Sequence, residues 1–91
     1  MSGMAALLAK GAEEVRAFAA SANAQRFGAD WLDRMAVRLE LASTMPLESI
    51  NREVLTIARL FLDSGPPLDE AAPSVGLALD ALQRQRKQAR S

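Results

Sequence analysis

The chain has 91 residues, enough for one small domain, and 49% of them are hydrophobic, which is too high a fraction for a disordered protein. Eleven basic and eleven acidic residues cancel, so the formal net charge is zero. The absence of Cys, His and Tyr excludes disulfides and thiolate ligands, and it removes the commonest general base, the thiol nucleophile and the phenolic acid from any catalytic site.

The Ala- and Leu-rich sequence favours helices, and the first predicted helix covers residues 4–22. Apolar or small residues recur there at alternating spacings of four and three, which places them on one stripe: Met4, Leu8, Gly11, Val15, Phe18 and Ala22. Gly11 either weakens this helix slightly or lets another backbone come close. Asn23, Gly28 and Asp30 then indicate a stop, a turn and a new cap.

The second predicted helix covers residues 29–43. Its core stripe consists of Leu32, Met35, Ala36, Leu39 and Ala42. Val37 and Leu41 form a second apolar strip on a different side, which indicates either a helix packed between neighbours or a contact with another chain. Trp31 lies in the first turn, where its indole N–H can still reach a partner.

The third predicted helix covers residues 46–62 and has the clearest start signal in the chain. Ser43 or Thr44 can cap it, and Pro46 suits the first turn because its missing N–H would be unpaired there in any case. The stripe of this helix, on which we centre the predicted core, consists of Ile50, Val54, Ile57 and Phe61. Gly65 at the C-cap and the two prolines after it end the helix.

The fourth predicted helix, residues 69–88, allows two interpretations. As one helix it has an amphipathic stripe of Leu68, Ala72, Val75, Leu79 and Leu82. Pro73 then falls near the first turn, Gly76 lies inside the helix, and Leu77 is exposed opposite the stripe. As a helix-turn-helix, Gly76 forms the turn, Leu77 plugs the core beneath it, and the basic residues that follow lie near DNA.

The helix-turn-helix interpretation also draws on a resemblance of the C-terminal half of the chain to a known family. The segment MPLESINREVLTIARLFLDSGPPLDEAAPSVGLALDALQRQRKQAR loosely resembles the C-terminal DNA-binding region of bacterial sigma factors. The shared features are a Pro before a helix carrying REVL, a Gly-containing break, an acidic-Ala-Ala helix, a turn Gly and a closing basic run. The segment departs from that pattern at Pro73 and Gln85, and Asp80 places a negative charge where phosphate would approach. We therefore favour the plain helix.

These elements predict an all-α fold, a compact antiparallel bundle of about four helices forming a single domain over residues 1–91. The short apolar stretch near the start, MAALLA, is too short for a signal peptide or a membrane span, so we expect a cytoplasmic protein with no membrane partner. We expect no catalytic residue, cofactor or metal site, and no enzyme. The adjacent Glu13 and Glu14 point about 100° apart on a helix and do not converge on an ion.

The favoured function is a non-enzymatic protein-binding module that contacts another protein or itself, as a homodimer or in a heteromeric complex. Small bacterial immunity proteins, antitoxins, inhibitors and chaperones work in this way, and the analogy is one of size and class. A core built from small side chains is thin for a lone monomer. The predicted partner-binding residues are Trp31, Arg34, Val37, Arg38 and Leu41.

The alternative function is a DNA-binding regulator that uses residues 68–87. Through Asp80 the chain has seven basic and eleven acidic residues, whereas from Ala81 onward it has four basic residues and no acid. The residues predicted to meet nucleic acid are Arg84, Arg86, Lys87 and Arg90. The simpler explanation of the same run is that cations stabilise the dipole at the end of a helix.

Overall fold

The computed structural model of the chain describes residues 3–89, without the side chains of residues 22, 23 and 89. Five α-helices confirm the predicted all-α fold, and residues 3–89 contain no strand. The helices are α1 (Gly3–Ala19), α2 (Ala29–Ala42), α3 (Leu47–Ser64), α4 (Leu68–Ala71) and α5 (Pro73–Ala89), with a 3-10 helix η1 (Ala22–Arg26) between α1 and α2.

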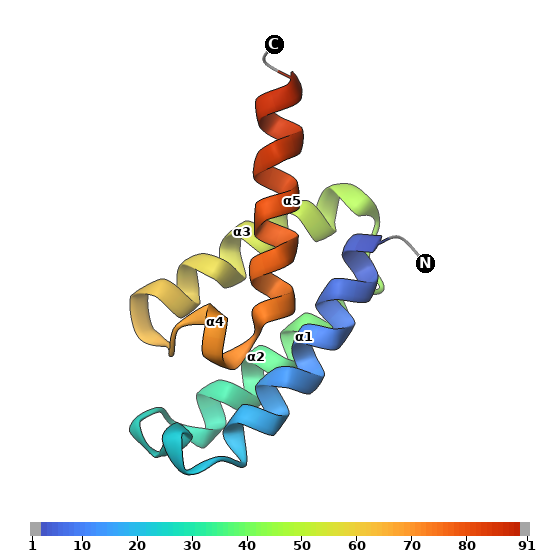
Figure 1. The fold of residues 1–91 in the computed structure, drawn as a ribbon. Coiled ribbons are helices and arrows are strands. Elements are labelled where there is room, and N and C mark those ends of the chain that lie inside the picture. Colours follow the sequence, from blue (N-terminus) through green and yellow to red (C-terminus); the bar gives the residue numbers. More distant parts are fainter. Residues whose placement is uncertain (1–2, 90–91) are drawn as a thin grey trace.

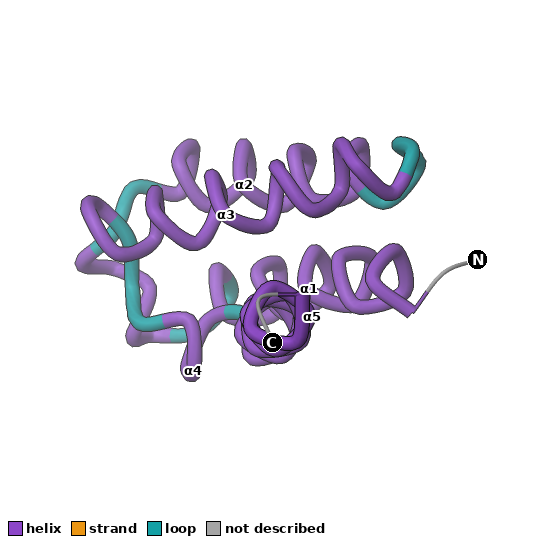
Figure 2. The backbone as a smooth tube through the Cα atoms, turned by 90° about the horizontal axis from the view of Figure 1, so that it is seen from above, coloured by secondary structure: helices purple, strands orange, loops and turns teal. Residues whose placement is uncertain are grey.

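The helices form two layers, with α2 and α3 in one layer and α1 and α5 in the other (Figure 2). The first three long helices run alongside one another in alternating directions, as an antiparallel bundle does (Figure 1). The last helix differs, because α5 crosses the bundle and its C-terminal part projects beyond it. Burial follows this arrangement, since Leu82 is the last buried residue of α5 and residues 83–88 are exposed.

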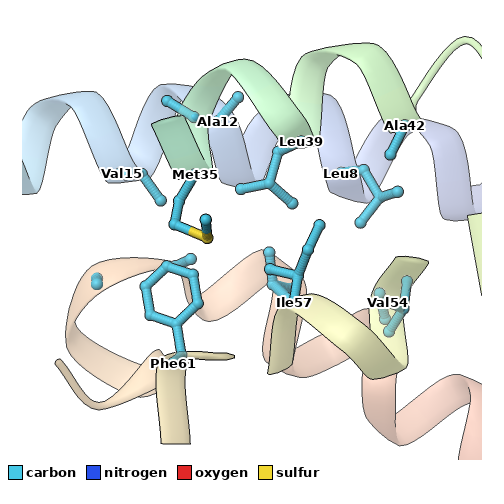
Figure 3. Packing of buried hydrophobic residues seen from close by; sticks show 14 of the residues in the cluster. Leu8, Ala12, Val15, Met35, Leu39, Ala42, Val54, Ile57 and Phe61 are labelled. Atoms are coloured by element: carbon cyan, nitrogen blue, oxygen red, sulfur yellow. The ribbon is translucent and has the colours of Figure 1, made fainter. Parts of the chain in front are cut away.

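The core lies among the four long helices, and Figure 3 shows side chains of the predicted stripes of α1 and α2 facing those of α3. Every predicted stripe residue of α2 and α3 is buried, and Phe61, Leu8, Leu32 and Leu39 are among the largest side chains that are fully buried. The crossing helix adds Val75, Ala78 and Leu82 to the same cluster. Helical periodicity in the sequence was therefore sufficient to identify the inward face of these helices.

The first helix ends at Ala19, three residues before the predicted end at Ala22. The turn that stops it is local, because both the backbone N–H and the hydroxyl of Ser21 donate to the carbonyl oxygen of Phe18, at 2.9 and 2.7 Å. A serine that bonds nearby backbone in this way competes with helix continuation. The rings of Phe18 and Phe27 then lie 6.3 Å apart and hold η1 against the end of α1.

The break near residue 72 matches neither interpretation of the C-terminal segment. Ala72 has a non-helical conformation, with φ −152° and ψ 68°, and α5 begins at the next residue, Pro73. Proline disfavours helical backbone at the residue before it and suits the first helical position, so the sequence at this point explains the break. Gly76 lies inside α5 and forms no turn there.

Gly11 and Gly76 both lie inside helices, but only Gly11 has a close neighbour from another helix. A Cβ added to Gly11 of α1 would lie 2.7 Å from the Cγ2 atom of Val75, whereas a Cβ added to Gly76 would meet nothing within 4 Å. Gly11 therefore lets the start of α5 approach α1, and the branched Val75 side chain has little freedom to move away. Gly76 has no such role and only lowers the helix propensity of α5.

We expect Gly11→Ala and Gly76→Ala to change stability in opposite directions. At Gly11 an overpacking cost of about 1–3 kcal/mol exceeds the gain in helix propensity, so the free energy of unfolding falls. At Gly76 the free energy of unfolding rises by about 0.5–1 kcal/mol because only the propensity changes. Urea denaturation of the two variants measures both effects, and a loss of stability in Gly76→Ala would contradict the position of Gly76 within a helix.

Candidate functional site

Trp31 packs into the domain, although the sequence left it open as an interface anchor. Its ring meets that of Phe61 edge to face, with the centroids 5.1 Å apart, and the side chain is half-buried. A Cβ added to Gly65 would lie 2.4 Å from the Cη2 atom of Trp31. Gly65 is the C-cap of α3 as predicted, but its φ of −112° is open to any residue, so the glycine is needed for the space that the indole occupies.

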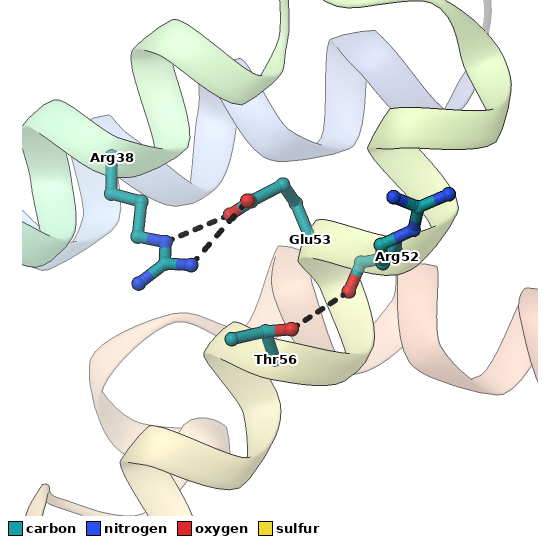
Figure 4. Close-up of polar contacts among 4 residues, drawn as sticks. All are labelled: Arg38, Arg52, Glu53 and Thr56. Atoms are coloured by element: carbon teal, nitrogen blue, oxygen red, sulfur yellow. Dashed lines mark hydrogen bonds and ion pairs between the residues drawn. The ribbon is translucent and has the colours of Figure 1, made fainter.

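Arg38 is engaged within the chain and links α2 to α3. Its Nε and Nη2 atoms donate to the two carboxylate oxygens of Glu53, at 2.8 and 3.4 Å (Figure 4). The hydrogen bond to Glu53 raises the pKa of the guanidinium above its ordinary value, partly offset by burial. This two-point contact fixes one pair of neighbouring helices, so Arg38 is less available to a partner than its position in the sequence suggests.

The remaining predicted partner-binding residues lie on the exposed side of α2. Arg34 is exposed, and the side chains of Val37 and Leu41 are 40% and 60% exposed. An ion pair between Arg16 of α1 and Glu40 lies on the surface of the same pair of helices. The exposed side of α2 therefore carries a small apolar strip, Val37 and Leu41, beside the exposed side chain of Arg34.

A larger apolar surface lies between α3, α4 and α5. This surface, which we call the α3–α5 groove, has a volume of about 620 Å³ and is lined by Leu55, Thr56, Ala58, Arg59, Leu62, Asp63, Leu68 and Leu79. Leu62 at its edge is 84% exposed. A neighbouring hollow shares Ala58, Leu62 and Leu68 and extends the apolar surface to Pro66 and Pro67.

Sequence reasoning missed the α3–α5 groove. Leu55 and Leu62 flank the predicted core stripe of α3, and their spacing predicts only that they widen it. Their spacing shows that they share a side of the helix, but it does not show whether another helix covers that side. The crossing direction of α5 leaves the side open, and this direction has no signal in the local pattern.

The basic residues at the end of the chain lie on the projecting part of α5. Arg84, Arg86 and Lys87 are all exposed, and Arg90 lies outside the described residues. Arg84 and Lys87 line one shallow hollow together with Leu77 and Asp80. The cations are therefore accessible, and an acidic and an apolar side chain interrupt the surface that they form.

Two further observations concern chemistry and membranes. Over residues 3–89, no group of three or more Asp or Glu side chains is arranged to hold a metal ion. The sequence excluded Glu14 as a metal ligand because its side chain diverges from that of Glu13. In the structure, Glu14 accepts hydrogen bonds from the N–H and the hydroxyl of Ser74 at the start of α5. None of the helices in the described part of the chain combines the length and apolar character needed to cross a bilayer.

Three exposed surfaces concern the predicted functions: the α3–α5 groove, the strip of Val37 and Leu41, and the basic end of α5. The groove is the most apolar of the three and lies on a helix whose other side is firmly packed in the core. Comparison with models of known protein families, with curated proteins and with solved structures gives no match to this chain.

Proposed function

We propose that this chain is a non-enzymatic protein-binding module whose principal contact surface is the α3–α5 groove. The observation that carries the proposal is the exposure of Leu62, 84% of whose surface faces solvent beside a hollow lined by further leucines. Single exposed apolar side chains are common on monomers, whereas contiguous apolar patches with a polar rim are typical of interaction sites. Arg59 and Asp63 supply such a rim.

The construction of α3 supports this use of the groove. Ile50, Val54, Ile57 and Phe61 hold one side of the helix in the core, and Leu55 and Leu62 lie on the opposite flank. A rigid helix that presents apolar side chains loses little entropy when a partner binds. The strip of Val37 and Leu41 on α2 supplies a second, smaller contact.

The competing function is nucleic-acid binding by the exposed cations of α5, namely Arg84, Arg86 and Lys87. In its favour, they lie on a projecting helix that a duplex can approach. Against it, Asp80 adjoins them, and Gly76 is helical at the position where the predicted motif needs a turn. A protein partner accounts for the exposed leucines of the α3–α5 groove, whereas a nucleic acid accounts only for the cations of α5.

A photo-crosslinking residue tests the proposal. We expect p-benzoylphenylalanine at position 62 of the full chain to give one protein adduct when it is irradiated in an extract of the producing cells, and the same residue at position 13 to give none. Position 13 is the control because Glu13 is exposed on α1, away from the groove. The captured protein, once identified and purified, should bind the unmodified chain and lose at least tenfold in affinity for Leu62→Glu.

One result would overturn the protein-binding function, and a second would then support the competing one. The first is the absence of any protein adduct, to this chain or another, from positions 62 and 41. The second is binding of duplex DNA that weakens with salt and is lost when Arg84, Arg86 and Lys87 are replaced by glutamine.

A further inference from the structure

We propose that the occupant of the α3–α5 groove is a second copy of this chain, so that the protein forms a two-fold symmetric dimer with Leu62 of each copy in the groove of the other. The inference rests on the proposed function, because it names the partner of the same surface. It is argued from the shape of the groove and from the distribution of charge around it.

The shape of the surface is self-complementary. Leu62, which is 84% exposed, lines the same hollow as Leu55, Leu68 and Leu79, so it offers an apolar side chain next to a space that another one can fill. In a two-fold interface the same patch meets itself, so a protrusion and a hollow on one face can each be filled by the other copy. Such a contact buries Leu62 and fills the groove in both copies.

The charges on the rim are also self-complementary. Asp63 lies in the last turn of α3 and lines the groove. Arg59 lies one turn earlier on α3 and also lines the groove, so the groove carries one charge of each sign on the same helix. A two-fold axis across the groove places Asp63 of one copy over Arg59 of the other.

The side chains at the centre of this arrangement are unpaired in the single chain. Neither Arg59 nor Asp63 takes part in an ion pair among residues 3–89, although Arg16 and Arg38 do. Antiparallel packing of two α3 helices about Leu62 brings Arg59 of each copy to Asp63 of the other. A uniformly acidic partner helix would meet repulsion at Asp63, and a uniformly basic one at Arg59, whereas a second copy matches both charges.

Sedimentation equilibrium of the purified full chain tests the dimer, over concentrations from about 1 to about 500 µM. We expect a reversible monomer–dimer equilibrium whose dissociation constant rises at least tenfold in Leu62→Glu. The matched control is Leu77→Glu, which changes an exposed leucine of α5 that does not line the groove. This control should leave the dissociation constant unchanged, and circular dichroism of dilute samples should show that both variants keep the helix content of the native chain.

Charge reversal tests the antiparallel geometry. Arg59→Asp and Asp63→Arg should each raise the dissociation constant several-fold, because each places two like charges together at both symmetric contacts. The double variant should restore the native value, since the pairs are reformed with their signs exchanged. An interface with a different protein does not predict this restoration.

A chain that stays monomeric at every concentration, or a dimer that Leu62→Glu leaves intact, overturns the inference. Neither result removes the proposed function, because the crosslinking residue at position 62 reports a different partner independently. The proposed function fails when neither position 62 nor position 41 captures a protein, and the dimer alone fails when position 62 captures another protein while the purified chain sediments as a monomer.

Discussion

Phe61→Ala is expected to lower the free energy of unfolding by about 3–5 kcal/mol, whereas Leu62→Ala, one residue later, should change it by less than about 0.5 kcal/mol. The two positions are adjacent on α3, but Phe61 is 1% exposed and Leu62 is 84% exposed. Removal of the phenyl ring loses its transfer free energy and leaves a cavity, while truncation of an exposed leucine does neither.

The cost at Phe61 is high because its surroundings cannot collapse easily into the space. The indole of Trp31 lies edge to face against the ring and is itself held over Gly65. Val54 and Ile57, on the same helix, are fully buried by other neighbours. An aromatic pair adds about 0.5–1.5 kcal/mol to the free energy that burial alone supplies.

Urea denaturation of the two variants, followed by circular dichroism and by Trp31 fluorescence, measures both values at a protein concentration where the chain is monomeric. A shifted midpoint with an unchanged slope shows that the change is one of stability. Equal losses at the two positions would contradict the orientation of α3, because they would mean that Leu62 is as well packed as Phe61.

Glu14→Ala is expected to destabilise the domain by about 1–3 kcal/mol, as loss of partners for a buried donor does. The carboxylate oxygens of Glu14 accept from the backbone N–H of Ser74 at 2.9 Å and from its hydroxyl at 2.8 Å. Ser74 is the second residue of α5 and only 3% exposed. A residue of α1 thus caps the start of α5, where N–H groups lack partners inside the helix and a negative charge is favoured.

The matched control is Glu13→Ala, which makes the same substitution at an exposed neighbour on α1 and should leave stability within experimental error. Denaturation in urea gives the difference, and amide hydrogen exchange locates it. Faster exchange is expected in the first turns of α5, with the hairpin of α1 and α2 remaining protected. Uniformly faster exchange throughout the chain would indicate that Glu14 supports the whole core and not the start of α5 in particular.

The sequence by itself determined the helices and their inward faces, because both depend on local physics. Every residue of the stripes predicted for α2 and α3 is buried, and α3 also buries Ala58, which lies outside its stripe. Pro73 contained the signal for the break before α5, since proline restricts the residue before it, whereas a single helix over residues 69–88 places Pro73 inside a helix. Close approach at Gly11 was one of the two alternatives that the sequence left open, and the sequence did not indicate which element approaches.

Tertiary structure alone decided which flank of each helix another helix covers. The crossing of α5 buries Val75 against Gly11 and leaves Leu62 open, and nothing in the spacing of either helix specifies this direction. The pairs Glu14–Ser74 and Arg38–Glu53 join residues 60 and 15 positions apart, so neither has a local pattern. Helical periodicity records which residues share a side, whereas the docking of helices, set by the shapes and charges of distant segments, decides whether that side becomes core or contact surface.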